Sequence, residues 1–268
     1  MYKVSIIGMG QMGGSLGKAL KTFGKKYDVT GIDKDKKTLK AALKLGAADR
    51  VSQSLNAAKD SEIIVICLPV DSISPVYEQL LKIAGKETVI TDAGSVKENI
   101  VLSKDKRNFV PAHPMAGREK NGIMSADAQM FKNANLIIAE NENPSAQKKV
   151  MQIWKDAGAK IVKMSAKKHD NLAALTSHLP HIIAFSLNKI YKESKRKNPE
   201  IDTLTAGSFK SMTRVSVSSA DMWAPIFAMN AANVRKHLND FIKELESFKK
   251  ALGSQNKLKK EILKTQKK

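Results

Sequence analysis

The first 165 residues alternate short apolar runs with amphipathic stretches. Buried parallel strands read as short, β-branched, fully apolar runs, whereas helices show apolar spacings of three and four. By this criterion strands are predicted at 4–7, 28–32, 63–67, 87–91, 108–112, 135–139 and 160–164. Helices are predicted from the turn after residue 7 to about residue 23, and at 36–45, 71–84 and 144–157. Such alternation with short joins predicts an α/β fold with a doubly wound, mostly parallel Rossmann-type sheet over residues 1–165.

The remaining residues, 166–268, have a different pattern. Long helical periodicities dominate, for example Leu172 to Lys195 and Ala231 to Leu252, and only Val215 to Val217 is an ambiguous strand. Apolar side chains recur every three or four residues between Leu175 and Ile190. A helical region of this size with so much apolar surface often needs a second subunit to cover it. We therefore expect an all-α dimerisation and substrate domain, and a homodimer formed through it.

The first strand leads into a glycine-rich turn, Gly8-x-Gly10-x-x-Gly13, followed by a helical pattern. In this context the first glycine permits the turn, the second lets a pyrophosphate approach the backbone, and the third lets helix and strand pack closely. The helix amino terminus, with Gln11 and Met12 in its first turn, offers unpaired N–H groups to phosphates. The turn predicts a dinucleotide site.

Asp33 ends the second strand, 20 residues after Gly13. An acid at this position accepts hydrogen bonds from the adenosine ribose and repels a 2′-phosphate, so NAD is the expected cofactor. Three lysines follow closely and leave NADP open; they are Lys34, Lys36 and Lys37. We also expect Leu68 and Pro69, which close the strand at 63–67, to line the cofactor site.

The chain is strongly basic, with 46 Lys and Arg against 26 Asp and Glu and a net charge of +20. The excess is densest in a lysine-rich tail, 249–268. Nucleic-acid surfaces usually combine charge with arginine forks and stacking rings, but most basic residues here are lysine and aromatic residues make up only 5%. A solvated helix end is therefore the favoured reading of the tail, and nucleic-acid binding is not expected.

The cysteine count, the apolar runs and the spacing of two histidines bear on the cell compartment and on metal binding. Cys67 is the single cysteine, which excludes an internal disulfide and an all-cysteine metal site. No apolar run approaches the ~20 residues that cross a bilayer, and the apolar strand at 4–7 leaves no room for a signal peptide before it. We expect a cytoplasmic protein without a membrane segment. His178 and His181 share a helix face, but no third ligand is evident, so no metal site is expected.

Histidine is the side chain best matched to moving a proton near neutral pH. His113 ends a predicted strand, at the sheet edge where α/β proteins place their ligands. His178 and His181 lie in an apolar helix and need hydrogen-bond partners or a cavity. His169 and His237 lie on polar helical stretches, and we expect both to be solvated.

Five motifs occur together and in order. Besides the glycine turn they are Asp92-Ala-Gly-Ser-Val-Lys97, Phe109-Val-Pro-Ala-His-Pro-Met-Ala-Gly117, Ser177-His-Leu-Pro-His181 and Met212-Thr-Arg214 with Trp223. In these motifs the chain resembles the prephenate/arogenate dehydrogenase family of tyrosine biosynthesis over roughly residues 1 to 250. The resemblance implies NAD(P)-dependent oxidative decarboxylation of a cyclohexadienyl dicarboxylate, a nucleotide-binding domain and a helical dimerisation domain.

The resemblance also implies roles for particular residues. His113 would accept the ring hydroxyl proton, and Ser95 would hydrogen-bond that histidine or the hydroxyl. Arg214 would bind a carboxylate through its guanidinium fork, and His181, rather than His178, would support substrate binding. Trp223 would wall the pocket or pack at an interface. Glu119 would gate entry or pair with a neighbouring base.

Other readings stay open from the residues alone. Prephenate is favoured over arogenate, which differs in carrying an ammonium in place of a side-chain ketone, but no residue decides between them. Another two-domain β-hydroxyacid or imine reductase would use a lysine with a neighbouring asparagine, for which Lys167 or Lys168 with Asn171 is available. A non-catalytic nucleotide-sensing or nucleic-acid-binding protein using the basic tail is the third reading.

Overall fold

The computed structural model describes residues 1–268 except 25, 101–107, 118–120, 141–142 and 267–268. Its amino-terminal half is built on a six-stranded sheet in which every pairing is parallel, in the order β3-β2-β1-β4-β5-β6. The strands are β1 (Tyr2–Ile7), β2 (Tyr27–Ile32), β3 (Arg50–Ser52), β4 (Ile63–Ile66), β5 (Val89–Asp92) and β6 (Phe109–Val110). The predicted Rossmann-type α/β fold is confirmed.

A second, three-stranded sheet was not predicted. It consists of β7 (Ala112–Pro114), β8 (Asn135–Ala139) and β9 (Lys160–Met164), with β7 antiparallel and β9 parallel to β8. The single strand expected at 108–112 is therefore wrong, because the chain passes from β6 to β7 at Pro111. Proline has no N–H to donate to a ladder, and at this residue the chain leaves one sheet for the other.

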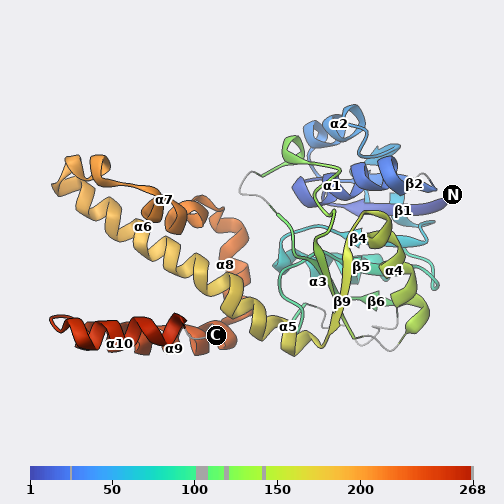
Figure 1. The fold of residues 1–268 in the computed structure, drawn as a ribbon. Helices are drawn as coiled ribbons and strands as arrows, with labels where there is room; N and C mark the ends of the chain where they lie inside the picture. Colours follow the sequence, from blue (N-terminus) through green and yellow to red (C-terminus); the bar gives the residue numbers. More distant parts are fainter. Residues whose placement is uncertain (25, 101–107, 118–120, 141–142, 267–268) are drawn as a thin grey trace.

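Helices cover both faces of the main sheet (Figure 1). They are α1 (Gln11–Ala19), α2 (Lys36–Lys44), α3 (Val70–Leu80) and α4 (Pro144–Asp156), with shorter helices η1 (Leu20–Gly24), η2 (Leu55–Ala58) and η3 (Ile123–Ser125). Successive strand residues point to opposite faces, so β4 sends Ile63 and Val65 to one core and Ile64 and Ile66 to another.

The second half is helical throughout its described residues. It comprises α5 (Ala166–Ala173), η4 (Ala174–His178), α6 (Leu179–Lys197), η5 (Pro199–Leu204), α7 (Gly207–Thr213), η6 (Arg214–Val217), α8 (Ala220–Met229), α9 (Ala231–Ala251) and α10 (Gln255–Gln266). The ambiguous strand at Val215 to Val217 is a 3₁₀ helix. The long helix predicted from Leu172 begins earlier and is interrupted by the π-helical turn η4, two residues before Pro180.

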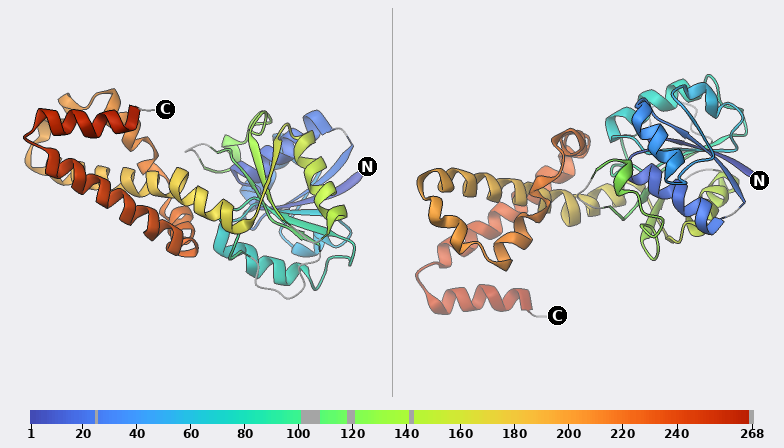
Figure 2. Two further views of the ribbon diagram at one scale, coloured as in Figure 1. Left: turned by 60° about the horizontal axis from the view of Figure 1, so that its bottom comes forward. Right: turned by 90° about the horizontal axis from the view of Figure 1, so that it is seen from above.

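The helical half joins the α/β half through α5 and extends away from it, as the two further views agree (Figure 2). One contact positions the site described below: α8 packs against α3, where Trp223 and Ile226 complete the core formed by Ile73 and Tyr77. Within the described residues, no helix is long and apolar enough to span a membrane.

Candidate active site

The glycine turn between β1 and α1 has the geometry that its sequence predicts. Gly8 has φ +90°, and a Cβ there would lie 2.4 Å from the carbonyl oxygen of Cys67. A Cβ on Gly13 would lie 2.1 Å from the carbonyl oxygen of Gly8. Any side chain at either position would displace backbone, so both glycines are required for the turn and the helix to pack this closely.

Gly10 differs from its two neighbours, because a Cβ there would meet nothing within 4 Å. It is the N-cap of α1, and no side chain caps the helix. The first turn of α1, which includes the half-buried Gln11 and Met12, therefore begins beside open space, at the positive end of the helix dipole. The cradle fits a pyrophosphate.

Asp33 lies at the end of β2 beside this cradle and is half-buried. One carboxylate oxygen accepts the backbone N–H of Met9 at 2.8 Å, and the other accepts that of Asp35 at 2.9 Å. Asp33 therefore holds the glycine turn in place, a role that the sequence did not suggest. A carboxylate oxygen can accept more than one hydrogen bond, so the ribose hydroxyls of a dinucleotide remain compatible with it.

Leu68 and Pro69 follow β4 at the same edge of the sheet. The Leu68 side chain borders Gly8, since its Cδ2 would be 2.8 Å from a Cβ on that glycine. Pro69 is exposed and is the N-cap of α3. Both residues thus lie beside the glycine turn.

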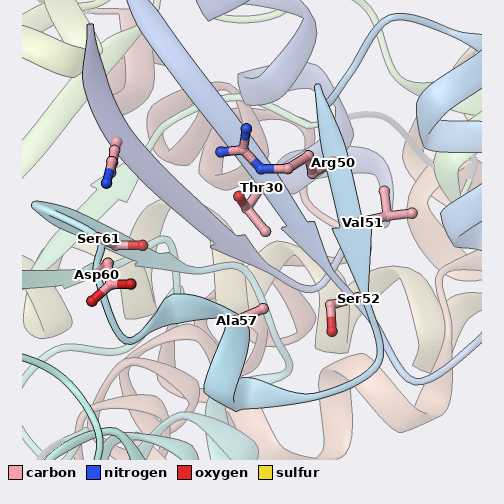
Figure 3. A pocket seen from close by; sticks show the side chains of 8 residues that line it. Thr30, Arg50, Val51, Ser52, Ala57, Asp60 and Ser61 are labelled. Atoms are coloured by element: carbon pink, nitrogen blue, oxygen red, sulfur yellow. The ribbon is translucent and has the colours of Figure 1, made fainter.

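A cavity of about 280 Å³ lies elsewhere in the α/β half (Figure 3). Its polar lining comes largely from the amino-terminal ends of strands and the segment before β4, and includes Lys3, Arg50 and Asp60. The glycine turn is at the carboxyl ends of the strands, where open α/β sheets bind ligands. This cavity is therefore separate from the dinucleotide cradle.

A buried ion pair supports the opposite rim of the site. Asp92, the last residue of β5, pairs with Lys97, and both side chains are fully buried. Asp92 also accepts the N–H groups of Gly94 and Ala112, while Lys97 donates to the carbonyl of Ala112 at 2.7 Å. Burial raises the pKa of Asp92 and lowers that of Lys97, and each effect is opposed by the partner's charge. The pair fixes the backbone immediately before His113.

His113 is the central residue of β7, paired with Ile137 of β8, and is half-buried. Its Nδ1 lies 2.8 Å from Nε2 of His169. Within the described part of the chain, Nε2 of His113 has no hydrogen-bond partner. Burial, reinforced by His169 and Lys97, lowers the pKa of His113 well below 6.5. The ring is therefore neutral at pH 7, with one nitrogen held and the other available.

The predicted exposure of His169 is wrong. The residue is 2% exposed, and its ring lies between His113 and the carboxylate of Asp170, with Nδ1 2.7 Å from Oδ1. The α5 sequence looks polar, but its buried face is made of His169, Asp170 and Ala173. His237 is half-buried rather than solvated, and its Nε2 lies within hydrogen-bond distance of Asn171.

Asp170 connects the two halves of the molecule. Its carboxylate accepts the backbone N–H groups of Lys97 at 2.8 Å and Glu98 at 2.9 Å. Its carbonyl accepts the side-chain amide of Asn230, which also donates to Nδ1 of His178 at 3.2 Å. Burial lowers the pKa of His178 to about 4, so this ring is neutral too.

His181 and Trp223 lie together in the helical half, and the ring of Trp223 also contacts that of His178. The rings of His181 and Trp223 stack with centroids 3.6 Å apart and planes inclined by 24°. Nδ1 of His181 donates to the carbonyl of Ser177, and burial lowers the pKa of His181. Trp223 is 7% exposed, and its buried indole N–H has no hydrogen-bond partner among the described residues. An unsatisfied buried donor of this kind is costly unless a ligand accepts from it.

The other predicted substrate residues are placed differently. Ser95 is half-buried in the segment after β5, but no hydrogen bond joins it to His113, both being among the described residues. Arg214 begins η6, which packs against α6, the helix that carries His181, and it is exposed in the single chain. Glu119 lies outside the described residues.

Sequence reasoning missed His169, Asp170 and the Asp92–Lys97 pair. A signal existed for Asp170, because Asp170, Ala174 and His178 follow one another at intervals of four along a helical stretch. Lys97 was visible only as part of a motif. Its burial depends on a partner five residues away across a turn, which periodicity does not reveal.

The geometry also bears on a catalytic lysine and on a metal site. Lys167 and Lys168 are both exposed on α5, which does not suit a catalytic lysine in a hydroxyacid dehydrogenase. Among the described residues, no group of three or more His, Cys, Asp or Glu side chains is arranged to hold a metal ion.

Comparisons with known proteins cover almost the whole chain. Residues 16–163 match the prephenate dehydrogenase nucleotide-binding domain, and residues 165–265 match the prephenate dehydrogenase dimerization domain. The chain is 32% identical to the cyclohexadienyl dehydrogenase of Zymomonas mobilis, covering 94% of this chain and 89% of that protein. It is 31% identical to the prephenate dehydrogenase of Bacillus subtilis, covering 92% and 69%.

A solved structure of prephenate dehydrogenase from Aquifex aeolicus, in complex with hydroxyphenyl propionate and NAD⁺, superimposes with a TM-score of 0.89. It is 30% identical, and the match covers 99% of this chain and 96% of that one. The resemblance seen in the sequence motifs is thus confirmed along both halves, and the chain belongs to the prephenate dehydrogenase family.

Proposed function

We propose that this protein catalyses the NAD-dependent oxidative decarboxylation of prephenate to 4-hydroxyphenylpyruvate, with His113 as the general base. The observation that carries the proposal is the state of His113: a neutral ring at the carboxyl edge of the sheet, with Nδ1 held by His169 and Nε2 available. The membership of both halves in the prephenate dehydrogenase family supports the same reaction.

In this reaction His113 acts as the general base. Its Nε2 accepts the proton of the ring hydroxyl as the carbon bearing that hydroxyl loses a hydride. NAD, when bound, supplies the hydride acceptor. The bond between the ring and its carboxylate then breaks, carbon dioxide leaves, and the electron pair moves into the ring, which becomes aromatic as its oxygen takes the proton back from His113. A base that is neutral at pH 7 is required for the first transfer, and the lowered pKa of His113 meets this requirement.

The cofactor would occupy the cradle at Gly10. The first-turn N–H groups of α1 would bind the pyrophosphate, with Gln11 and Met12 beside it, and Gly8 and Gly13 would allow the close approach. Asp33 would accept the ribose hydroxyls, which supports NAD over NADP. Leu68 and Pro69 would border the cofactor from the end of β4.

The substrate would lie between His113 and the stacked pair of His181 and Trp223. The unpartnered indole N–H of Trp223 supports a contact with a polar group of the substrate. Arg214 would bind a carboxylate, Ser95 would bind the hydroxyl, and Glu119 would act at the entrance. The relative from Aquifex aeolicus was crystallised with a hydroxyphenyl acid, which agrees with a site for a six-membered ring and a carboxylate.

The helical half would form a homodimer. It matches a dimerization domain, and its helices expose large apolar side chains in the single chain, including Ile190, Ile242, Leu245, Ile262 and Leu263. Burying such side chains against a second copy would stabilise both. We therefore propose residues 1–165 as the nucleotide-binding domain and 166–268 as the dimerisation and substrate domain. A cytoplasmic location stays a prediction.

Arogenate is the second candidate substrate. The chain is 28% identical to a chloroplastic arogenate dehydrogenase of Arabidopsis thaliana, although it covers only 39% of that protein. The two substrates share the ring on which His113 would act and differ at the side chain. The base and the cofactor cradle are therefore the same in either case.

One assay tests the proposal. The purified protein is given prephenate or arogenate with NAD or NADP, and reduction of the cofactor is followed by absorbance. We expect turnover that is fastest with prephenate and NAD. His113→Asn should lower kcat by about 10²–10⁴-fold with little change in KM, because it removes proton transfer and not binding. Failure to turn over either acid would contradict the proposed function, and faster turnover of arogenate would assign the second candidate.

A further inference from the structure

The ring of His113 is held by a chain of two further side chains. Nδ1 of His113 lies 2.8 Å from Nε2 of His169, and Nδ1 of His169 lies 2.7 Å from Oδ1 of Asp170. We propose that His169 and Asp170 are positioning residues, which keep the proton of His113 on Nδ1 and leave Nε2 as the base. This inference rests on the proposed function of His113.

The direction of the chain is set at Asp170. Three donors converge on its carboxylate: His169 and the backbone N–H groups of Lys97 and Glu98. A backbone N–H can only donate, so the carboxylate must accept from both. An acceptor-only group next to Nδ1 of His169 then requires that nitrogen to carry a proton.

The tautomer of His113 follows from that of His169. His169 is 2% exposed and commits the proton of its Nδ1 to Asp170. In the tautomer that carries this one proton, Nε2 of His169 is bare and can only accept. Nδ1 of His113 must therefore donate, and the neutral His113 carries its lone pair on Nε2, the nitrogen without a partner among the described residues.

The same chain prepares His113 for the positive charge that it gains. When Nε2 takes up the hydroxyl proton, the imidazolium still donates from Nδ1 to His169, which is itself polarised by the Asp170 carboxylate. No second proton needs to move. The logic is that of a catalytic triad, in which a carboxylate fixes the tautomer of the base and stabilises its charged form, with one more ring between carboxylate and base.

Two carboxylates among the described residues lie near this point, Asp170 and Asp92. Lys97, from the segment after β5, and His178, from η4, also face the pair, and both disfavour charge on His113. Lys97 is paired with Asp92. The Asp170 carboxylate is thus left to act on the His113 ring, and it does so through His169.

Substitutions at His169 test the proposal with fewer side effects than substitutions at Asp170. The Asp170 carboxylate also holds the backbone at Lys97 and Glu98, so changing it would disturb the segment that follows Ser95. His169 has two recorded side-chain partners, His113 and Asp170. His169→Phe keeps a ring of similar size and removes the acceptor, whereas His169→Gln offers an oxygen that can accept from Nδ1 of His113. His237→Gln, at a half-buried histidine outside the site, is the matched control.

The experiment measures kcat and KM against pH for the three variants, with NAD binding and thermal unfolding of each. We expect His169→Phe to lower kcat by about 10²–10³-fold and to change KM less than about threefold. The acid limb of its kcat profile should move to lower pH by about one unit, because the imidazolium of His113 loses its acceptor. His169→Gln should recover at least about tenfold of the lost kcat, and His237→Gln should match the unmodified protein.

A second readout does not depend on turnover. In protein labelled with ¹⁵N-histidine, NMR reports which nitrogen of His113 carries the proton, with His113→Asn giving the assignment. We expect Nδ1–H in the unmodified protein and a shift toward Nε2–H in His169→Phe.

An Nε2–H tautomer in the unmodified protein overturns the inference. So does a fall in kcat of His169→Phe without a shift in the acid limb of its kcat profile. If neither acid is turned over, the proposed function fails, and the NMR result alone decides on the tautomer. If His169→Phe does not fold, His169→Gln and the tautomer of the unmodified protein decide.

Discussion

The imidazole of His181 lies nearly flat on the indole of Trp223, with ring centroids 3.6 Å apart. The stack joins α6 to α8, and α8 in turn packs on α3 of the nucleotide-binding half. The stack thus joins two residues that are 42 positions apart in the sequence, and α8 anchors it to the sheet domain. It leaves one buried donor, the indole N–H, without a partner among the described residues.

Trp223→Phe tests whether that donor contacts substrate. Phenylalanine keeps an aromatic face for His181 and removes only the N–H and part of the ring. Losing one hydrogen bond of about 1 kcal/mol should raise the KM for prephenate about fivefold and leave kcat nearly unchanged. Trp154→Phe is the control, since that indole N–H is also buried and unpartnered but lies in the core on the other face of the sheet. Equal KM values for the two variants would contradict the assignment.

Gly10 and Gly13 give a matched pair of substitutions in one turn. Gly13→Ala would place a methyl group 2.1 Å from a carbonyl oxygen, and it should lower the free energy of unfolding by about 1–3 kcal/mol or prevent folding. Gly10→Ala meets no protein atom and should cost about 1 kcal/mol or less. Its methyl group would occupy the cradle, so the Kd for NAD should rise about tenfold or more. Calorimetric titration with NAD and urea unfolding measure the two effects; NAD affinity that is unchanged in Gly10→Ala would place the pyrophosphate elsewhere.

The local pattern predicted the buried strands of the α/β half well, because buried parallel strands are fully apolar, but it missed β3 (Arg50–Ser52), a short edge strand without a buried residue. The strands at 135–139 and 160–164 have the predicted bounds. The glycine turn was equally well predicted, since its motif stands between a predicted strand and a predicted helix. Pro111 was the exception: its missing N–H separates two sheets, but the apolar run across it looks continuous.

Residues that act through partners far along the chain could not be predicted. His169 sits in a sequence of lysines, and what buries it is its place between His113, 56 residues earlier, and the Asp170 carboxylate. Lys97 is charged, yet it is fully buried because Asp92 and the Ala112 carbonyl accept from it. Such burial arises only when distant parts of the chain come together in the fold, so neither composition nor periodicity can predict it.

Asp33→Ser should change cofactor preference. Removing the carboxylate removes repulsion of a 2′-phosphate, while Lys34, Lys36 and Lys37 remain to attract it. Because Asp33 also accepts the N–H groups of Met9 and Asp35, affinity for both cofactors should fall. The informative quantity is therefore the ratio of kcat/KM for NADP to that for NAD, which should rise about tenfold or more. Asp28→Ser, at the opposite end of β2, should leave the ratio unchanged, and an unchanged ratio in Asp33→Ser would remove Asp33 from the ribose site.

The buried histidines should make stability fall in mild acid. The pKa of His178 is about 4 in the folded protein and about 6.5 in the unfolded chain. Between these values the unfolded chain binds a proton that the folded protein does not, so the contribution to stability is present above pH 6.5 and is lost as the pH falls toward 4. From pH 7.5 to pH 5 this one group should lower the free energy of unfolding by about 2 kcal/mol. His113 and His181, whose pKa values are also lowered, add in the same direction.

His178→Gln tests this contribution, because it keeps an acceptor for Asn230 and removes the titration. Urea unfolding of this variant should show a smaller loss of unfolding free energy between the two pH values. A loss equal to that of the unmodified protein would mean that His178 is protonated without cost, and hence that it is accessible to water in the folded state.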